Sequence, residues 1–205
     1  MHFGTSNRLL DSMIGSFIPR KIFHLILASI PPGVYWTGSL NRWEMASGLL
    51  GLLVLSLSIE WARLRNEWIN QVFIRGFGFL MKEKESTTPT SINHTLGSYL
   101  VVVALTEHDI AVASMFFLSL GDPVASLLGR QWGKPFFGSK SLLGTGANFL
   151  VCLALGFAIL KSPLESVLGA AASSVAELYS GRIDDNLTVP VASAAVLSLY
   201  RIGFG

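Results

Sequence analysis

The most informative stretch of the chain covers residues 121–146 and reads GDPVASLLGRQWGKPFFGSKSLLGTG. Its first part is largely apolar but contains Asp122, and an ionisable group inside a membrane helix is costly and usually functional. Its second part is rich in glycine and contains Arg130, Lys134 and Lys140, so backbone N–H groups and cations together suit a phosphate group. A carboxylate beside such a loop, at a membrane face, predicts magnesium-dependent phosphate chemistry on a lipid.

The composition of the whole chain indicates a membrane protein. The 205 residues are 51% hydrophobic and 14% charged, with a mean hydropathy of +0.53. Soluble domains carry roughly 25% charged residues, so this chain is expected to cross a membrane several times. A net charge of +2 is too small to indicate nucleic acid as a partner. The single cysteine, Cys152, lies in an apolar run, which excludes a disulfide framework and predicts a buried structural thiol.

Apolar runs predict an all-α polytopic fold of about seven transmembrane helices with a cytoplasmic N-terminus. The predicted spans cover about residues 22–40, 44–61, 92–106, 110–129, 142–160, 163–180 and 187–204. Residues 1–205 are expected to form a single integral-membrane domain, with residues 1–21 as an interfacial or cytoplasmic lead-in that includes a short helix over residues 9–18. Asp11 argues against a cleavable signal peptide there. Pro31 and Pro32 are expected to bend or break the first span.

The segment after the second predicted span is expected to lie on the membrane surface. It combines several cations with an apolar stripe, which predicts an amphipathic interfacial helix. The residues of that stripe are Trp68, Val72, Phe73, Phe77 and Leu80. Just before this segment, Glu60 and Arg63 are three residues apart on one helix face and could form an ion pair.

The distribution of lysine and arginine predicts the orientation of the spans. With seven spans and the N-terminus inside, twelve of these residues fall in inner segments and three in outer segments. Inner segments of membrane proteins are enriched in positive charge, so this bias supports the assignment. It places the glycine-rich loop, the Arg20–Lys21 pair and residues 181–186 together on the cytoplasmic face, where nucleotides are found.

Asp122 is predicted to lie on a helix face that can accommodate a close neighbour. In a helix, Asp122, Ser126, Gly129 and Gly133 fall at positions i, i+4, i+7 and i+11, which share one side. The two glycines are four residues apart, so another helix or a ligand can approach the backbone there. The plainer interpretation is a helix-packing stripe whose aspartate reaches water at the cytoplasmic end.

A second group of oxygen ligands lies in the segment ELYSGRIDDN over residues 177–186. Asp184, Asp185 and Asn186 are hard ligands of the kind that Mg²⁺ takes, together with substrate phosphates and water. Gly181 is expected to end the preceding helix. Alternatively, the segment is a solvated turn in which Asn186 caps the last span. Glu177 is harder to explain in that way, because it lies in the apolar run AAASSVAEL.

Two further groups of residues are candidates for anion binding. Gly138, Ser139, Lys140, Ser141 and Gly144 loosely resemble a phosphate-binding turn, although their spacing is not that of a P-loop. The lysines of this loop could equally bind anionic lipid headgroups. Arg20, Lys21 and His24 lie within one turn at the cytoplasmic mouth of the first span. An Arg–Lys pair can be a simple topology anchor, whereas His24 lies deeper in the apolar segment.

In this order, the motifs resemble those of the CTP-dependent polyprenol kinase family. This family comprises dolichol kinases, phytol kinases and CTP-using diacylglycerol kinases, and is more distantly related to the CDP-diacylglycerol synthases. The resemblance covers nearly the whole chain, from RKIFH through GDPVASLLGRQWGK and GSKSLLGT to DDNLTVPVAS. The family commonly has an acidic residue before the glycine that matches Gly144, and this chain has Leu143 there. That departure indicates a different metal ligand, or an altered substrate or activity.

The resemblance implies transfer of the γ-phosphate of CTP to the hydroxyl group of a membrane lipid alcohol, with Mg²⁺, at the cytoplasmic face. The implied catalytic residues are Asp122, Glu177, Asp185, Lys140 and His24. The implied metal ligands are Asp122, Asp184, Asp185 and Glu177. The implied nucleotide and phosphate contacts are Arg20, Lys21, Gly121, Gly129, Gly133, Lys134, Gly138, Ser139, Ser141, Gly144 and Asn186. Phosphoryl transfer depends mainly on positioning and charge neutralisation, which these residue types can supply.

Two other functions use the same residues. A CTP-dependent cytidylyltransferase would join CMP to phosphatidate and release pyrophosphate, with the same metal and phosphate contacts. A small membrane transporter would use Asp122, Glu177 and His24 as a proton or ion path. Clustering of the acidic residues at one face, away from the membrane midplane, argues against the transporter. The expected partners are CTP, a lipid alcohol such as a polyprenol, phytol or diacylglycerol, and the bilayer.

Overall fold

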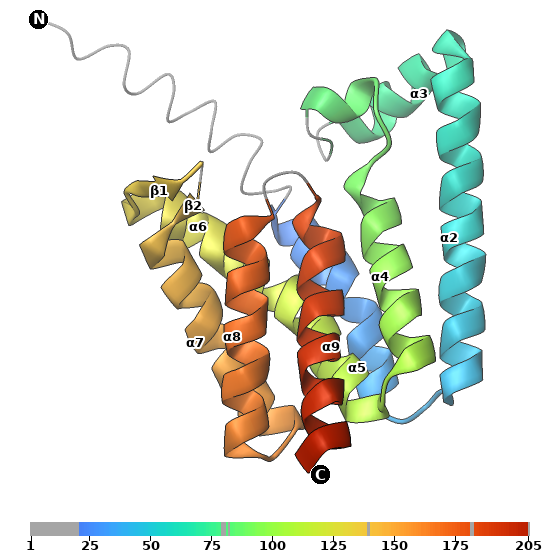
Figure 1. The fold of residues 1–205 in the computed structure, drawn as a ribbon. Coiled ribbons are helices and arrows are strands. Elements are labelled where there is room, and N and C mark those ends of the chain that lie inside the picture. The colour runs from blue at the N-terminus through green and yellow to red at the C-terminus, as the bar shows by residue number, and fades with distance from the viewer. Residues whose placement is uncertain (1–20, 79–80, 82, 139, 181–182, 205) are drawn as a thin grey trace, which may run out of the picture.

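The computed structural model describes residues 21–78, 81, 83–138, 140–180 and 183–204, and most of them are helical (Figure 1). Residues 21–36 form the first described helix. The helices that follow are α2 (Arg42–Arg65), α3 (Glu67–Phe77), α4 (Ser91–Leu105), α5 (His108–Phe116), α6 (Asp122–Trp132), α7 (Leu142–Ile159), α8 (Pro163–Tyr179) and α9 (Asp185–Phe204). The predicted all-α class is confirmed. The helix predicted over residues 9–18 lies outside the described residues.

Three short elements complete the described structure. A 3-10 turn, η2 (Glu83–Ser86), precedes α4, and a π-helical turn, η3 (Phe117–Gly121), joins α5 to α6. Strands β1 (Pro135–Phe137) and β2 (Lys140–Ser141) form a small antiparallel hairpin between α6 and α7. The hairpin is a local departure from the helical pattern, and it lies within the glycine-rich loop.

Four helical segments among the described residues are long and apolar enough to cross a membrane. They are Arg42–Arg65, His108–Trp132, Leu142–Ile159 and Asp185–Phe204, and Ser91–Leu105 is a shorter apolar helix. The chain is therefore an integral membrane protein by length and composition of its helices. Seven crossings and a cytoplasmic N-terminus stay predictions. The helix over residues 21–36 continues through Pro31 and Pro32, so the two prolines do not break it, as is common in membrane helices.

The segment His108–Trp132, formed by α5, η3 and α6, is the central element of the fold. Most of it is buried, whereas the other three candidate spans are largely exposed along their length. It packs against α7 and α9, and α2 lies at the edge of the molecule against α4 (Figure 1). The buried core around it includes Tyr99, Met115, Phe117 and Leu197. The predicted buried thiol of Cys152 is confirmed in this core.

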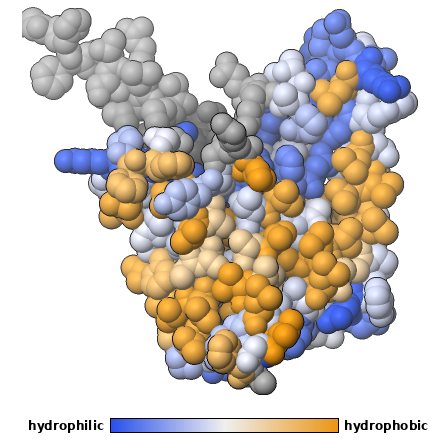
Figure 2. Space-filling model, viewed as in Figure 1, coloured by the Kyte–Doolittle hydropathy of each residue, from blue (hydrophilic) through white to orange (hydrophobic). Residues whose placement is uncertain are grey.

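The outer surface of the helices is strongly apolar. Figure 2 shows hydrophobic side chains over the middle of this face, with hydrophilic side chains at the end that holds α3 and again toward the opposite end. Exposed leucines and valines follow one another along α2, including Val54 and Leu57. A soluble monomer rarely exposes an apolar surface of this extent, whereas a helix in contact with lipid does so along its whole length.

The segment after α2 folds largely as predicted. α3 is a separate helix with no buried residue, and its Trp68, Val72 and Phe77 side chains are exposed. The predicted ion pair at the end of α2 is confirmed: Arg63 Nη2 lies 2.6 Å from Glu60 Oε2, and both side chains are buried. The location of α3 on the membrane surface stays a prediction.

Candidate active site

The described helices enclose one large cavity of about 970 Å³. Its lining comes from the helix over residues 21–36 and from α2, α3, α4, α6, α7, α8 and α9, with residues of β2 beside them. One end of the cavity is charged. The ion-paired residues there are Lys21, Asp122, Lys140, Glu177 and Asp185, which we call the charged cluster, and Arg130 of α6 also lines the cavity. Segments that are far apart in the sequence therefore come together around a single space.

Asp122 is the first residue of α6 and directly follows the π-helical turn. Such turns occur mostly as single insertions within α-helices, frequently at functional sites. The side chain is 3% exposed, and Oδ2 accepts a hydrogen bond of 2.8 Å from Lys21 Nζ. The Ser126 hydroxyl, one turn further along α6, lies 3.4 Å from Oδ1. The buried carboxylate is thus paired, as a buried charge must be.

Lys140 joins two other carboxylates on the opposite side of the cluster. Its Nζ donates to Glu177 Oε1 at 2.5 Å and to Asp185 Oδ2 at 3.1 Å. Burial alone would lower the pKa of Lys140, but the negative charges of Asp185, Asp122 and Glu177 outweigh burial and raise the pKa above its ordinary value. Lys140 is therefore a permanent cation among three carboxylates. Thr145 Oγ1 lies 3.4 Å from Glu177 Oε2, a contact that the sequence motifs did not indicate.

The hairpin and the start of α7 are held against α6 by close backbone packing. The Ser141 hydroxyl accepts a hydrogen bond from the Gly144 backbone N–H at 3.1 Å and so caps α7. A Cβ atom at Gly133 would overlap this same hydroxyl, and a Cβ atom at Gly144 would lie 2.8 Å from the carbonyl oxygen of Ala125. The close approach predicted for this face of α6 is thus made by the chain's own hairpin and α7. It fixes Lys140 at the cavity.

The segment before α9 corrects one prediction. Asp184 Oδ1 accepts hydrogen bonds from the Asn186 backbone N–H at 3.1 Å and from Asn186 Nδ2 at 2.5 Å. Asp184 therefore caps α9, and the prediction that Asn186 does so is wrong, because aspartate and asparagine cap helices equally well and the helix begins two residues earlier than predicted. Asn186 is buried inside the first turn, and Asp185 directs its carboxylate to Lys140. α8 ends at Tyr179, and Gly181 lies outside the described residues.

The predicted site residues fall into three groups. Besides the charged cluster, the cavity is lined by His24, Gly129, Ser141, Gly144 and Asn186, which were all predicted contacts. Gly121 lies instead in the core beside Cys152 and Asn148, and Gly133, Lys134, Gly138 and Asp184 do not line the cavity. Lys134 is exposed. Arg20 and Ser139 lie outside the described residues.

Leu143 stands where the resemblance to the lipid kinase family leads us to expect an acidic residue. Its side chain is half-exposed and does not line the cavity. The leucine therefore leaves the charged cluster of this chain intact. The three carboxylates of the cluster all come from other positions on α6, α8 and α9.

The donor set of the cluster fits a magnesium ion only together with a nucleotide. Within the described ranges, no three aspartate, glutamate, histidine or cysteine side chains form a group that could hold a metal ion by themselves. Mg²⁺ usually takes one or two carboxylates and completes its octahedron with substrate phosphates and water. Asp122, Glu177 and Asp185 can supply such carboxylates at the cavity.

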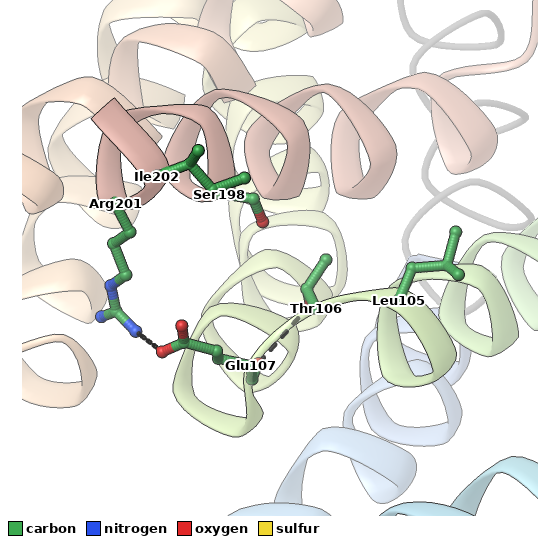
Figure 3. A pocket seen from close by; sticks show the side chains of 6 residues that line it. All are labelled: Leu105, Thr106, Glu107, Ser198, Arg201 and Ile202. Carbon is green, nitrogen blue, oxygen red and sulfur yellow. Dashed lines mark hydrogen bonds and ion pairs between the residues drawn. The ribbon is translucent and has the colours of Figure 1, made fainter. Parts of the chain in front are cut away.

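A second, smaller pocket of about 200 Å³ lies at the opposite end of the molecule, where α5 begins and α9 ends (Figure 3). Its charged residues are Glu107 and Arg201, which form an ion pair across it. It contains none of the predicted site residues.

Comparison with known proteins supports the resemblance in the motifs. No family model matches the chain, and no solved structure matches it. The chain is 25% identical to CTP-dependent diacylglycerol kinase 1 of Saccharomyces cerevisiae, over 88% of this chain and 72% of that protein. It is 26% identical to the protein of the same name from Eremothecium gossypii, over 86% and 65%, and 27% identical to that from Schizosaccharomyces pombe, over 66% and 72%.

These relatives are longer than the chain, which spans about two thirds to three quarters of their lengths. The matched region in each case covers most of the chain, at identities of 25% to 27%. The predicted resemblance is thereby confirmed, and the chain is a relative of the CTP-dependent lipid kinases.

Proposed function

We propose that the protein transfers the γ-phosphate of CTP to the hydroxyl group of a membrane lipid alcohol at the cytoplasmic face of the membrane. The observation that supports this function best is the cavity, which joins the charged cluster to walls of apolar side chains. A phosphate donor and a lipid acceptor need these two environments side by side. Diacylglycerol is the first acceptor to test, because three relatives have it in their names. Polyprenols and phytol are the next.

The charge of the cluster supports a role for a divalent cation. The two lysines and three carboxylates of the cluster sum to one negative charge, and Arg130, which also lines the cavity, brings the sum to zero. The three carboxylates would nevertheless repel the phosphates of a nucleotide beside them unless a further cation lay between the two. We therefore propose Mg²⁺ as the cofactor, held by Asp122, Asp185 or Glu177 together with the phosphates. Bound there, Mg²⁺ would neutralise charge on the transferring phosphate.

The residues of the chain would bind and orient the two substrates. Lys140 and Lys21 project ammonium groups into the cavity and can donate to phosphate oxygens. α7 begins at the cavity wall, where Ser141 and Gly144 lie, so the positive end of its dipole favours an anion at the same place. His24 lines the cavity one turn after Lys21.

The reaction forms a bond between the acceptor oxygen and the γ-phosphorus and breaks the bond between that phosphorus and the β-phosphate bridging oxygen. CDP leaves, and the hydroxyl proton must go to a base. Asp122 is the carboxylate that we assign to this role, because it lies in the wall of the cavity with Lys21 and Ser126 as its partners. Loose phosphoryl transfer needs little more from the base than correct orientation.

A radiochemical assay tests the proposal. Purified protein in detergent is given γ-labelled CTP, GTP, UTP or ATP with dioleoylglycerol, a polyprenol, phytol or farnesol. We expect labelled lipid phosphate and CDP with CTP, abolished by EDTA and restored by Mg²⁺. Release of pyrophosphate with formation of a CDP-lipid would show that the protein is a cytidylyltransferase and not a kinase. Absence of turnover with every pair of substrates would favour the transporter.

A further inference from the structure

We propose that the apolar part of the cavity, between the helix over residues 21–36, α2 and α4, binds the hydrocarbon chain of the acceptor lipid. This inference rests on the proposed function and adds where in the molecule the acceptor lies. We call this part of the cavity the apolar groove. Its walls are the apolar cavity-lining residues of the three helices: Phe23, Leu27, Ile30, Pro31, Leu52, Leu55, Ile59, Ile92 and Leu96.

Each of the three helices presents a single face to the groove. The lining positions on the first helix are 21, 23, 24, 27, 28, 30 and 31, those on α2 are 52, 55, 56, 59 and 60, and those on α4 are 91, 92, 95, 96 and 99. Spacings of three, four and seven residues place side chains on one side of a helix. Three stripes therefore converge on one space, although the helices belong to three separate parts of the chain.

The apolar side chains of these stripes are not covered by the rest of the protein. The large ones on the first two helices, from Phe23 to Ile59, are between 41% and 58% exposed, and so is Ile92 on α4. They nevertheless line the walls of a cavity that is partly open to the outside, and so do not simply form the outer surface of the bundle. Apolar surface of this kind in a membrane protein is covered by hydrocarbon or by another protein segment.

Continuity with the charged cluster identifies the occupant. His24 and Leu27 are three residues apart on the same helix and line the same cavity, so a molecule in the groove has its upper end beside Lys21 and Asp122. That molecule must combine a polar end group with an apolar body. A lipid alcohol has this chemistry, whereas a transmembrane helix of a partner would bring backbone and side chains too bulky to reach Asp122.

The length of the groove matches one leaflet. Residues 21–30 cover about 14 Å of helix at 1.5 Å per residue, which is roughly half of the ~30 Å hydrocarbon thickness of a bilayer. The groove therefore holds the part of the acceptor that lies in the leaflet nearest the charged cluster. Hydrocarbon beyond that depth extends past Ile30 into the surrounding lipid.

α3 forms the upper rim of the groove, and Arg63 positions it. Phe73 and Phe77 line the cavity with their rings 5.2 Å apart. The buried Arg63 guanidinium lies 5.3 Å from the centre of the Phe73 ring and donates to Asn70 Oδ1 at 3.2 Å. Arg63 also pairs with Glu60, so the rim is tied to the end of α2. The two aromatic rings thus lie where the acceptor's polar end enters the charged region.

A matched pair of leucine variants on α2 tests the groove. Leu55 lines it and Leu57 does not, yet both are exposed to a similar degree, at 58% and 49%. We expect Leu55→Trp to raise the apparent KM for dioleoylglycerol in detergent micelles about fivefold or more, while the KM for CTP stays within about twofold. Leu57→Trp should change neither. If Leu55→Trp fails to fold, Ser56→Leu fills the same face with fewer added atoms.

Photolabelling separates failure of the groove from failure of the kinase activity. The probe is a diacylglycerol with a diazirine near the glycerol end of one acyl chain. We expect labelled peptides from residues 21–36 and from α2, and less label in Leu55→Trp. If the enzyme is active but labelled elsewhere, or if Leu55→Trp leaves the lipid KM unchanged, the proposal of lipid binding in the groove is wrong and the proposed kinase activity stands. If the protein is labelled in the groove but inactive with every acceptor, the proposed kinase activity is wrong and lipid binding in the groove stands.

The remaining occupant is a second copy of the chain. In that case Leu55→Trp would lower the mass of the purified particle, measured by light scattering, without a change in the lipid KM. That result would also overturn the proposal.

Discussion

Each end of the molecule holds a group of acidic residues around basic side chains. The two ends differ in the share of hydrogen-bond donors that the basic side chains use. At the end opposite the large cavity, Arg201 contacts Glu107 (Figure 3), and it also contacts Asp109 and Glu165. Its three nitrogens make five hydrogen bonds to these carboxylates, at 2.6 to 3.0 Å. Five is the full number of donors on a guanidinium group.

The charged cluster is less saturated. Among the described residues, Lys21 donates one hydrogen bond and Lys140 donates two, although each ammonium group has three donors. The cluster also faces about 970 Å³ of cavity, compared with about 200 Å³ beside Arg201. A saturated guanidinium ties α5, α8 and α9 together, whereas partly used lysines facing a cavity can still bind a ligand. We propose that this number of partners distinguishes a structural cluster around Arg201 from a ligand-binding cluster at the cavity.

The largest expected effect separates the two ends directly. Asp122→Asn should lower lipid phosphate formation by about 10²- to 10³-fold, because the neutral amide cannot act as a base and binds Mg²⁺ far more weakly than a carboxylate. The variant should still purify as a folded particle, since an amide costs less in an apolar environment than a carboxylate. Glu107→Gln is the matched control at the other end and should keep wild-type turnover. Full activity of Asp122→Asn would remove Asp122 from the reaction.

A smaller effect is expected within the glycine-rich loop. Lys140→Ala should raise the KM for CTP by about tenfold or more and change the KM for dioleoylglycerol little, because the lost ammonium group is a phosphate donor. Lys134→Ala, at an exposed position outside the cavity, should raise the KM for CTP less than Lys140→Ala does. Lys161→Ala, in the connection between α7 and α8, is the neutral control. An effect of Lys140→Ala on the lipid alone would favour headgroup binding by the loop.

The π-helical turn provides a test of how Asp122 is positioned. A Cβ atom at Gly121 would lie 2.9 Å from Cys152 Sγ, so Gly121→Ala should displace the start of α6. We expect kcat to fall several-fold while the KM for CTP changes little, because the misplaced Asp122 still leaves Lys140 in position. Cys152→Ala removes the clashing sulfur atom and should restore part of kcat in the double variant. If the double variant has the same low kcat as Gly121→Ala, the loss of kcat comes from contact with Asn148 or from the backbone, and not from contact with Cys152.

The smallest effect on activity is expected at the saturated end. Arg201→Met should lower the melting temperature by roughly 3–8 °C, because three carboxylates lose their shared cation at a partly exposed position. Turnover per folded molecule should stay within about twofold. The measurement is thermal unfolding in detergent beside the radiochemical assay. Unchanged stability with a large loss of turnover would reverse the roles that we assign to the two clusters.

The helices of this chain could be predicted closely because their limits are local. The runs at 142–160, 163–180 and 187–204 correspond to Leu142–Ile159, Pro163–Tyr179 and Asp185–Phe204. Polar residues, glycine or proline end the apolar run at each helix limit. These residues can be read from the local sequence without knowledge of the rest of the fold. The cap of α9 is wrongly predicted because Asp184 and Asn186, which lie two residues apart, cap a helix equally well.

The pairings within the site could not be predicted, because they depend on tertiary contacts. Lys21 was considered as a phosphate contact, and nothing in its spacing indicates Asp122, 101 residues away, as its partner. The π-helical turn depends on partners such as Cys152, whose Sγ lies 3.8 Å from the Phe117 carbonyl oxygen. What the motifs did indicate is that the segments around Lys21, Asp122, Lys140 and Glu177 share one space.

The separation between Lys21 and Asp122 has a consequence for how the protein is made. A ribosome adds 101 residues after Lys21 before its counter-ion exists, and a further 63 before Asp185 can meet Lys140. Until Asp122 is added, the Lys21 ammonium group lacks the Asp122 carboxylate as its partner. On the proposed function, we expect a chain that ends before α9 not to consume CTP, because it lacks Asp185 beside Lys140.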